Sequence, residues 1–132
     1  MHLMPSETIS ISIARNRHDV YRFVSNLKNL PKWATTFCLS IRKAGRDWVA
    51  RTPQGPMIIQ IEKKNRLGVV DHVVIPAPGI EVFVPMRVIR NGQGSKVLFT
   101  LFQSPGMTAK DHARDLKMVR QDLATLKKVL ER

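Results

Sequence analysis

The segment from Thr108 to Arg132 carries the pattern that most constrains the fold of this chain. Residues of one seam recur at alternating spacings of four and three positions: His112, Leu116, Val119, Leu123, Leu126 and Leu130. This spacing places them along one face of an α-helix, with most of the Lys and Arg residues lying off that face. Thr108 and Asp111 fit the start of such a helix, because a Thr side chain caps it and an acidic residue follows three positions later. The sequence therefore predicts one long C-terminal helix whose apolar side needs a partner.

The preceding part of the chain offers that partner as a β-sheet. Between about residues 39 and 103, stretches rich in β-branched residues alternate with Gly, Pro and Asn turn signals. Connections this short join antiparallel neighbours, so we expect an antiparallel sheet whose apolar face the helix covers. A coiled coil with a second molecule is the alternative use of the seam. The predicted strands are Leu39–Lys43, Trp48–Thr52, Met57–Glu62, Val69–Ile75, Ile80–Arg90 and Lys96–Gln103.

The N-terminal part adds a first strand and two short helices. Residues 8–14 alternate between polar and apolar types, which predicts a half-buried strand. Asn16 fits the N-cap of a following helix, and Pro31 fits the start of a second one. The apolar stripe of the first helix consists of Val20, Phe23, Val24 and Leu27. The predicted fold is α+β: one domain over residues 1–132, with a seven-stranded curved antiparallel sheet, two short helices between strands one and two, and the long C-terminal helix.

The hairpin turns predict which side chains share a face of the sheet. They imply the cross-strand pairs Arg90–Ser95, Val88–Val97, Met86–Phe99, Val84–Leu101, Ile75–Ile80 and Val73–Val82. Side chains alternate between the two faces of a strand, so this register gathers an apolar set on one face. That face is the predicted core: Val73, Ile75, Ile80, Val82, Val84, Met86, Val88, Val97, Phe99 and Leu101. The same register places His72, Glu81 and Arg87 together on the opposite face as a surface polar cluster.

The charge balance raises the question of anionic partners. The chain has 22 Lys and Arg residues against 10 Asp and Glu residues, a formal net charge of +12. The basic residues are scattered from Arg15 to Arg132 without a run of five, so we interpret the charge as a solubility feature and expect no nucleic-acid partner. Binding to nucleic acid or another anionic surface is the alternative that rests on charge alone.

Other features of the sequence concern location and cofactors. No apolar run reaches the length of a membrane span, and the first residues do not resemble a secretion signal, so we expect a cytoplasmic protein without stable membrane insertion. The single cysteine, Cys38, fits a reducing compartment, and its apolar neighbours indicate a buried thiol. His and Cys residues lack metal-ligand spacing and no phosphate-binding glycine motif is present, so we expect no metal and no cofactor.

Two segments resemble a known superfamily. The first segment is Val20-Tyr21-Arg22-Phe23-Val24 followed by Asn29-Leu30-Pro31-Lys32-Trp33, and the second is the terminal segment 122–130. They are similar to the START-like helix-grip superfamily called SRPBCC, in particular to its small bacterial polyketide cyclase/dehydrase-like proteins. The resemblance covers residues 7–132. It implies a curved sheet that grips the C-terminal helix, with an apolar cavity between them that holds a lipid or another hydrophobic guest.

Two polar residues are candidates for chemistry in such a cavity. In the predicted register Asp71 shares the apolar face with Val73, so its carboxylate would be paired, protonated or exposed to a polar pocket. His112 begins the helical seam and has a side chain that exchanges protons near neutral pH. We predict Asp71 and His112 as a catalytic pair; the alternatives are a solvated strand end for Asp71 and a half-exposed helix-end residue for His112.

The predicted function is binding of a small hydrophobic or aromatic molecule by a monomer or homodimer. The predicted ligand-binding residues are Trp33, Val73, Val84, Met86, Phe99, Leu116 and Val119. The alternative is an enzyme of the polyketide cyclase/dehydrase kind, in which Asp71 and His112 move protons within the cavity.

Overall fold

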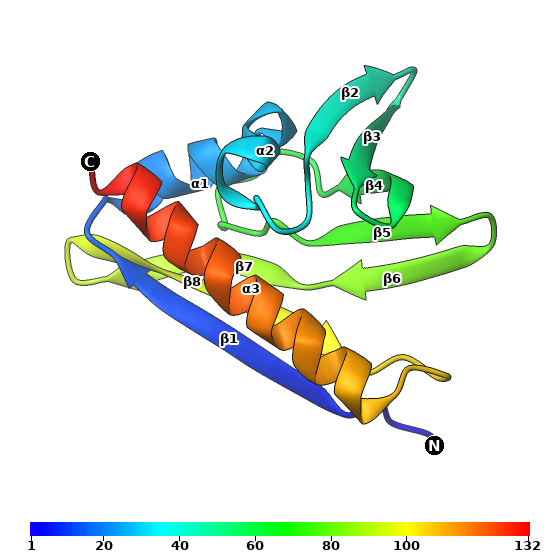
Figure 1. Ribbon diagram of the computed structural model, residues 1–132. Helices are drawn as coiled ribbons and strands as arrows, with labels where there is room; N and C mark the ends of the chain where they lie inside the picture. Colours follow the sequence, from blue (N-terminus) through cyan, green and yellow to red (C-terminus); the bar gives the residue numbers. More distant parts are fainter.

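The computed structural model describes all 132 residues (Figure 1). A strand, two helices and seven further strands precede the long final helix. In chain order the elements are β1 (Ser6–Ile13), α1 (Arg17–Ser25), the 3₁₀ turn η1 (Leu27–Asn29), α2 (Leu30–Trp33), β2 (Ser40–Ala44), β3 (Asp47–Thr52), β4 (Gly55–Ile61), β5 (His72–Ala77), β6 (Ile80–Val84), β7 (Met86–Asn91), β8 (Gly94–Phe102) and α3 (Ala109–Leu130).

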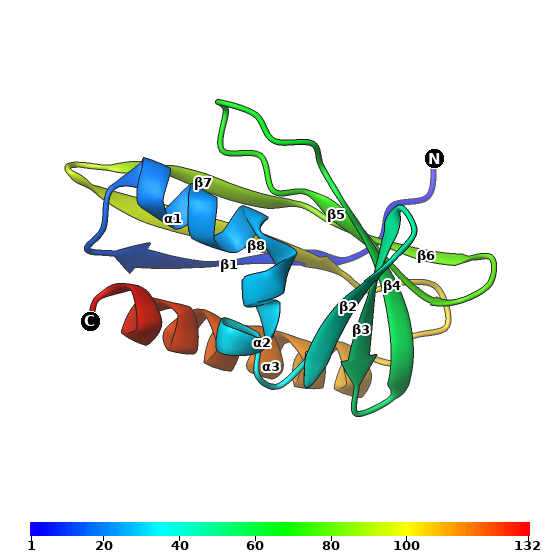
Figure 2. The same ribbon diagram turned by 90° about the horizontal axis from the view of Figure 1, so that it is seen from above.

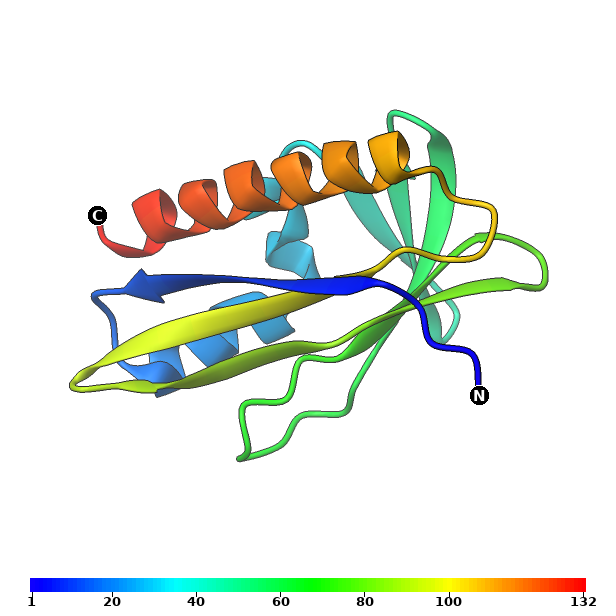
Figure 3. The same ribbon diagram turned by 90° about the horizontal axis from the view of Figure 1, so that it is seen from below.

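The strands form two antiparallel sheets that together make one curved layer. The first sheet has the order β1-β8-β7 and the second has the order β2-β3-β4-β5-β6. Figures 2 and 3 show the second sheet turning steeply away from the plane of the first. The fold is thus a curved antiparallel sheet with a long C-terminal helix, as predicted.

The strand count differs from the prediction, with eight strands instead of seven. The predicted strand Ile80–Arg90 is divided at Pro85 into β6 and β7, which belong to different sheets. Proline has no backbone N–H for a ladder hydrogen bond, so a break at this position follows from its chemistry. The Pro85 carbonyl still accepts a hydrogen bond from the Thr100 N–H at 3.0 Å, which connects the break to β8.

Helix α3 lies along β1 and beside α2, and its predicted seam faces the core. Its first turn is capped by the Thr108 hydroxyl, which accepts a hydrogen bond from the Asp111 N–H at 3.0 Å. At its other end, the Arg15 guanidinium donates to the Leu130 carbonyl at 2.9 Å. A cation at the C-terminal end of a helix satisfies free carbonyls and complements the helix dipole. The buried seam residues are Leu116, Leu123, Leu126 and Leu130.

One of the two predicted hairpin registers is confirmed and the other is wrong. Across β7 and β8 the pairs Met86–Phe99, Val88–Val97 and Arg90–Ser95 form as predicted. Across β5 and β6 the pairing is shifted by one residue, and an irregularity separates Val74 from Ala77. Pro76 lies within that irregularity, where its missing N–H interrupts the ladder. The observed pairs are His72–Val84, Val73–Phe83, Val74–Val82 and Ala77–Ile80.

This one-residue shift exchanges the faces of β5. Val73 pairs with exposed Phe83, and Ile75 pairs with Ile58 of β4, on the face away from the core. Their predicted place in the core is therefore wrong. The predicted Val84–Leu101 pair is also wrong, because the β7–β8 ladder ends at Met86–Phe99 and β6 belongs to the other sheet. Exposed Ile80 also lies outside the core. The members of the predicted core that are buried are Val84, Met86, Val88 and Val97.

Candidate functional site

The concave face of the sheet and the helix α3 enclose the apolar interior of the molecule. Buried side chains of β1, β4, β7, β8, α1, α2 and α3 form one cluster. Several apolar side chains around that cluster are only half-buried, among them Trp48 of β3, Ile61 of β4, Phe99 and Leu101 of β8, and Val119 of α3. These side chains pack against the cluster and keep part of their apolar surface exposed.

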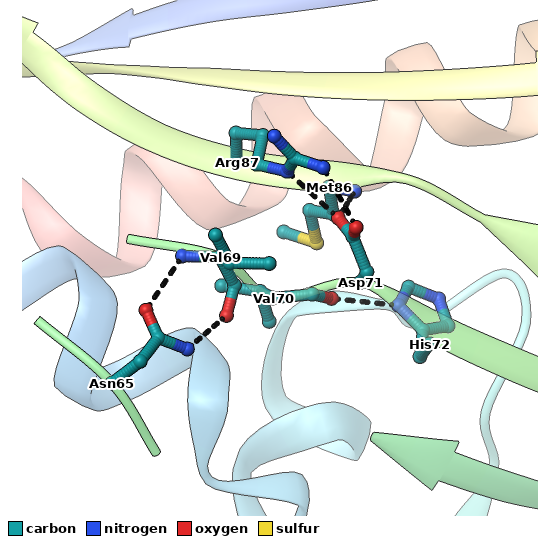
Figure 4. A network of polar contacts seen from close by, with 7 residues as sticks. All are labelled: Asn65, Val69, Val70, Asp71, His72, Met86 and Arg87. Atoms are coloured by element: carbon teal, nitrogen blue, oxygen red, sulfur yellow. Dashed lines mark hydrogen bonds and ion pairs between the residues drawn. The ribbon is translucent and has the colours of Figure 1, made fainter. Parts of the chain in front are cut away.

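Asp71 does not lie in this interior, which corrects the sequence prediction of its orientation. Its carboxylate accepts hydrogen bonds from Arg87 Nε at 2.9 Å, from Arg87 Nη2 at 2.8 Å and from the Met86 N–H at 2.9 Å (Figure 4). These bonds hold the pKa of Asp71 below its ordinary value, with the Arg87 hydrogen bond as the largest cause. The reason for the difference is the shifted register of β5, because a slip of one residue moves every side chain to the other face.

His72 takes the interior position instead, so the predicted surface cluster of His72, Glu81 and Arg87 is wrong. The His72 ring meets the edge of the Phe99 ring with centroids 5.9 Å apart. Its Nδ1 atom lies 3.0 Å from the Val70 carbonyl oxygen (Figure 4). Burial lowers the pKa of His72, which favours the neutral imidazole. The sequence signal for the orientation of His72 is Pro76, which lies in the irregularity of the β5–β6 ladder and was not part of the predicted hairpin register.

The other residue of the predicted catalytic pair, His112, lies half-buried in the first turns of α3. Its backbone N–H donates to the Thr108 carbonyl at 3.0 Å, which is part of the helix start. The Asp71 carboxylate is bound to Arg87 and Met86. The contacts around Asp71 therefore bring it together with β7 and not with His112.

The predicted ligand-binding residues fall in three different environments. Trp33, Val84, Met86 and Leu116 are buried, with Met86 only 1% exposed. Phe99 and Val119 are half-buried beside the core cluster. Val73 lies on the outer face of β5 and borders a hollow of about 420 Å³ together with Asp71 and Phe83.

Trp33 has a feature that sequence reasoning did not predict. Its indole Nε1 atom is buried and has no hydrogen-bond partner. The residue itself is only 4% exposed, at the end of α2. A buried N–H without an acceptor costs about 1–3 kcal/mol, so such groups are rare in folded proteins. The interior of this molecule thus contains one donor that the chain leaves unsatisfied.

Two further polar groups hold the segment between α2 and β2 against the interior. The Asp122 carboxylate of α3 accepts hydrogen bonds from the Thr36 N–H at 3.0 Å and from the Thr36 hydroxyl at 2.7 Å. Burial raises the pKa of Asp122, and the Thr36 hydrogen bonds oppose that shift. Nearby in the sequence, burial raises the pKa of the Cys38 thiol to about 11, so Cys38 is the buried, unreactive thiol that the sequence predicts.

A second and larger hollow lies on the outside of α1. It has a volume of about 870 Å³ and runs between α1 and the loop that joins β4 to β5. We call it the basic groove, and it is lined by Arg15, Arg17, His18, Asp19, Tyr21, Arg22, Phe23, Ser25, Asn26, Asn29, Lys64, Asn65, Arg66 and Gly68. The sequence does not predict this groove, because α1 and the loop contribute its basic residues from distant parts of the chain.

The structure shows no cluster of metal-binding side chains and no helix that could cross a membrane. No group of three or more His, Cys, Asp or Glu side chains is placed to hold a metal ion. No helix is both long enough and apolar enough to cross a membrane.

Solved structures share this architecture at low sequence identity. The protein XoxI from Bacillus cereus is 18% identical, with a TM-score of 0.79 and 96% of each chain covered. The Aha1 dimer from Colwellia psychrerythraea is 18% identical, with a TM-score of 0.75 and 97% of each chain covered. Ara h 8.0201 is 12% identical, with a TM-score of 0.67, covering 97% of this chain and 98% of that one.

A fourth similar structure is DynU16, a protein of the dynemicin biosynthetic locus. It is 13% identical with a TM-score of 0.73, and the match covers 96% of this chain and 47% of that one. No family model and no curated protein matches the sequence. These likenesses show a helix-grip-like fold, which is consistent with the SRPBCC type that the sequence resembles.

Proposed function

We propose that this protein binds a small, mainly apolar molecule between the concave face of its sheet and helix α3. The helix-grip-like fold supports the proposal, because it sets a long helix across a curved sheet. The site that we propose is the wedge between these two layers. The side chains of Phe99 and Leu101 on β8 and of Val119 on α3 are half-buried beside the core cluster, so each layer offers apolar surface to a ligand in that wedge. Apolar burial gives affinity in such sites, while a few polar groups fix the orientation of the ligand.

The observation that carries the proposal is the unpartnered Nε1 of Trp33. A ligand with a carbonyl or hydroxyl oxygen supplies the acceptor that this buried N–H lacks, and it removes the cost of the unsatisfied group. The interior residue His72 adds a second polar group beside Phe99. The proposed ligand is therefore a hydrophobic or aromatic molecule that carries at least one oxygen acceptor.

The proposal is binding and not catalysis. A cyclase-like mechanism with Asp71 and His112 requires both groups within reach of one reacting centre. Asp71 instead forms a bidentate ion pair with Arg87. The Asp71–His112 pair therefore does not support the enzymatic alternative.

Titration with Nile red, a neutral dye with a carbonyl acceptor, tests the proposal. We expect saturable binding with enhanced dye fluorescence, and we expect Val119→Trp to weaken it about tenfold by filling the wedge. Trp33→Phe removes the donor and is expected to weaken binding several-fold, as one hydrogen bond is worth about 0.5–1.5 kcal/mol.

The matched control is Ile89→Trp, which adds a ring of the same size to an exposed position of β7. It is expected to bind the dye like the unmodified protein. A folded Val119→Trp variant with unchanged dye affinity, or equal loss in the control, contradicts the proposed site. Native mass spectrometry of the purified protein then identifies any lipophilic molecule that remains bound.

A further inference from the structure

The basic groove has two walls that come from separate parts of the chain. One wall is α1 with the residues next to it, and the other is the loop 62–71 between β4 and β5. Figures 2 and 3 show this loop projecting from the sheet beside α1. The groove is distinct from the interior between the sheet and α3, so its role is independent of the proposed lipophilic ligand.

The charge in this groove is strongly unbalanced. It is lined by five Arg and Lys residues and by a single acidic residue, Asp19. Asp19 is already engaged, because its carboxylate forms an ion pair with Arg15 at 3.0 Å. The remaining cations have no carboxylate partner: Arg17, Arg22, Lys64 and Arg66. Four positive charges thus face one hollow from two sides without compensation from the chain.

The loop that carries two of these charges is held in a fixed shape. The Asn65 side chain donates to the carbonyls of Lys63 and Val69, and its oxygen accepts from the backbone N–H groups of Leu67 and Val69. The Asn65 backbone N–H donates to the Tyr21 hydroxyl at 2.8 Å, which joins the loop to α1. A preorganised site loses little conformational entropy when a ligand binds.

Two contacts in the middle of the loop connect it to α1 and to β7. The Arg17 guanidinium donates to the Arg66 carbonyl at 3.4 Å, across the groove. The Val88 N–H donates to the Gly68 carbonyl at 2.9 Å, which fixes the loop to β7. The walls therefore keep the like charges close together, an arrangement that an anionic ligand stabilises.

The shape and composition of the groove favour a small ligand. Its volume of about 870 Å³ is in the range of small-molecule sites. Guanidinium groups match phosphate oxygens with paired hydrogen bonds, and a Lys ammonium adds a point charge. Tyr21 and Phe23 are half-buried in the same lining and offer ring surface for an aromatic group. We propose that the basic groove binds an organic polyphosphate of the nucleoside di- or triphosphate class.

Isothermal titration with ATP in a buffer of low ionic strength tests this inference. Arg22→Gln combined with Lys64→Gln removes one cation from each wall, and neither side chain has a hydrogen bond within the protein, so the variant is expected to fold. We expect it to weaken ATP binding by about tenfold or more. The control is Arg42→Gln combined with Arg46→Gln, which removes the same charge beside the β2–β3 hairpin and outside the groove.

The controls separate a groove from diffuse attraction. Adenosine, which lacks phosphate, is expected to bind at least about tenfold more weakly than ATP. Equal loss of ATP affinity in the two double variants overturns the proposal, as does the absence of ATP binding by the folded protein. Binding of a short oligothymidylate without binding of ATP also overturns it, and assigns the groove to single-stranded nucleic acid.

Discussion

At the scale of single residues, Asp71 has a structural role that follows from its three hydrogen bonds. The carboxylate receives two bonds from Arg87 and one from the Met86 N–H, and its side chain is 13% exposed. These contacts connect the start of β5 to β7, and so they bridge the two sheets at the Pro85 break. Hydrogen bonds to a mostly covered carboxylate are stronger than those between neutral groups.

Asp71→Asn is therefore expected to lower the free energy of unfolding by about 1–2 kcal/mol near neutral pH. The pKa of Asp71 is lowered in the folded protein, so the stabilisation is present above its unfolded value and is lost as the pH falls through the lower folded value. Urea unfolding near pH 7 and near pH 3 measures the difference. The gap between the two proteins closes in acid, and equal urea midpoints near pH 7 contradict this role of Asp71.

The neighbours Asp71 and His72 also show how far sequence reasoning reaches. The sequence predicts both residues within the strand Val69–Ile75; the observed β5 begins at His72, so Asp71 lies directly before it, and both side chains take the face opposite to the predicted one. Alternation along a strand makes that assignment depend entirely on register. The turn after Arg90 contains Gly92 with a φ of 59° and sets its register locally, so the β7–β8 pairs were predictable. The β5–β6 register depends in addition on the irregularity at Pro76, which no periodic pattern records.

At the scale of elements, the loop between β4 and β5 depends on Gly68. Its φ is +76°, and a Cβ atom there would collide with the Val88 carbonyl oxygen. Gly79, in the turn between β5 and β6, has a similar φ of +80° but open space around it. Alanine at either position adopts the same unfavourable positive φ, but only at Gly68 does its Cβ atom also collide with the Val88 carbonyl oxygen.

Gly79→Ala is expected to cost about 1–2 kcal/mol of unfolding free energy from the left-handed backbone alone. Gly68→Ala is expected to cost more than that, because the loop must move away from β7 and lose the Val88 N–H bond. Thermal unfolding of the two variants compares them directly. An equal loss of stability contradicts the steric explanation at Gly68.

The long helix and the strand count show which features of the helices and strands can be predicted from the sequence. The α3 seam and its Thr108 cap were predictable because both depend on residues within a few positions of one another. The predicted single strand across Pro85 was wrong, although proline at that position already indicates a break. The basic groove was not predictable, since Arg22 and Lys64 line the same hollow only because α1 lies beside the loop between β4 and β5.

At the scale of the whole molecule, the net charge of +12 acts on stability as well as on binding. Like charges repel more strongly in the folded state, which holds them closer together than the unfolded chain does. Salt shortens the range of that repulsion to about 10 Å at 0.1 M. We therefore expect the thermal midpoint to rise by a few degrees when sodium chloride is added to a buffer of low ionic strength.

The basic groove predicts where that repulsion is concentrated. Removing two of its charges with Arg22→Gln and Lys64→Gln is expected to raise the midpoint of the ligand-free protein at low salt by about 2–4 °C, corresponding to about 0.5–1 kcal/mol. The same double variant then gains less from added salt, because part of the repulsion is already gone. Arg42→Gln with Arg46→Gln changes the net charge equally, but these residues lie outside the groove and are expected to shift the midpoint less. Equal shifts in both double variants mean that repulsion depends on total charge alone, and that the four unpaired cations around α1 and its facing loop do not act as a cluster.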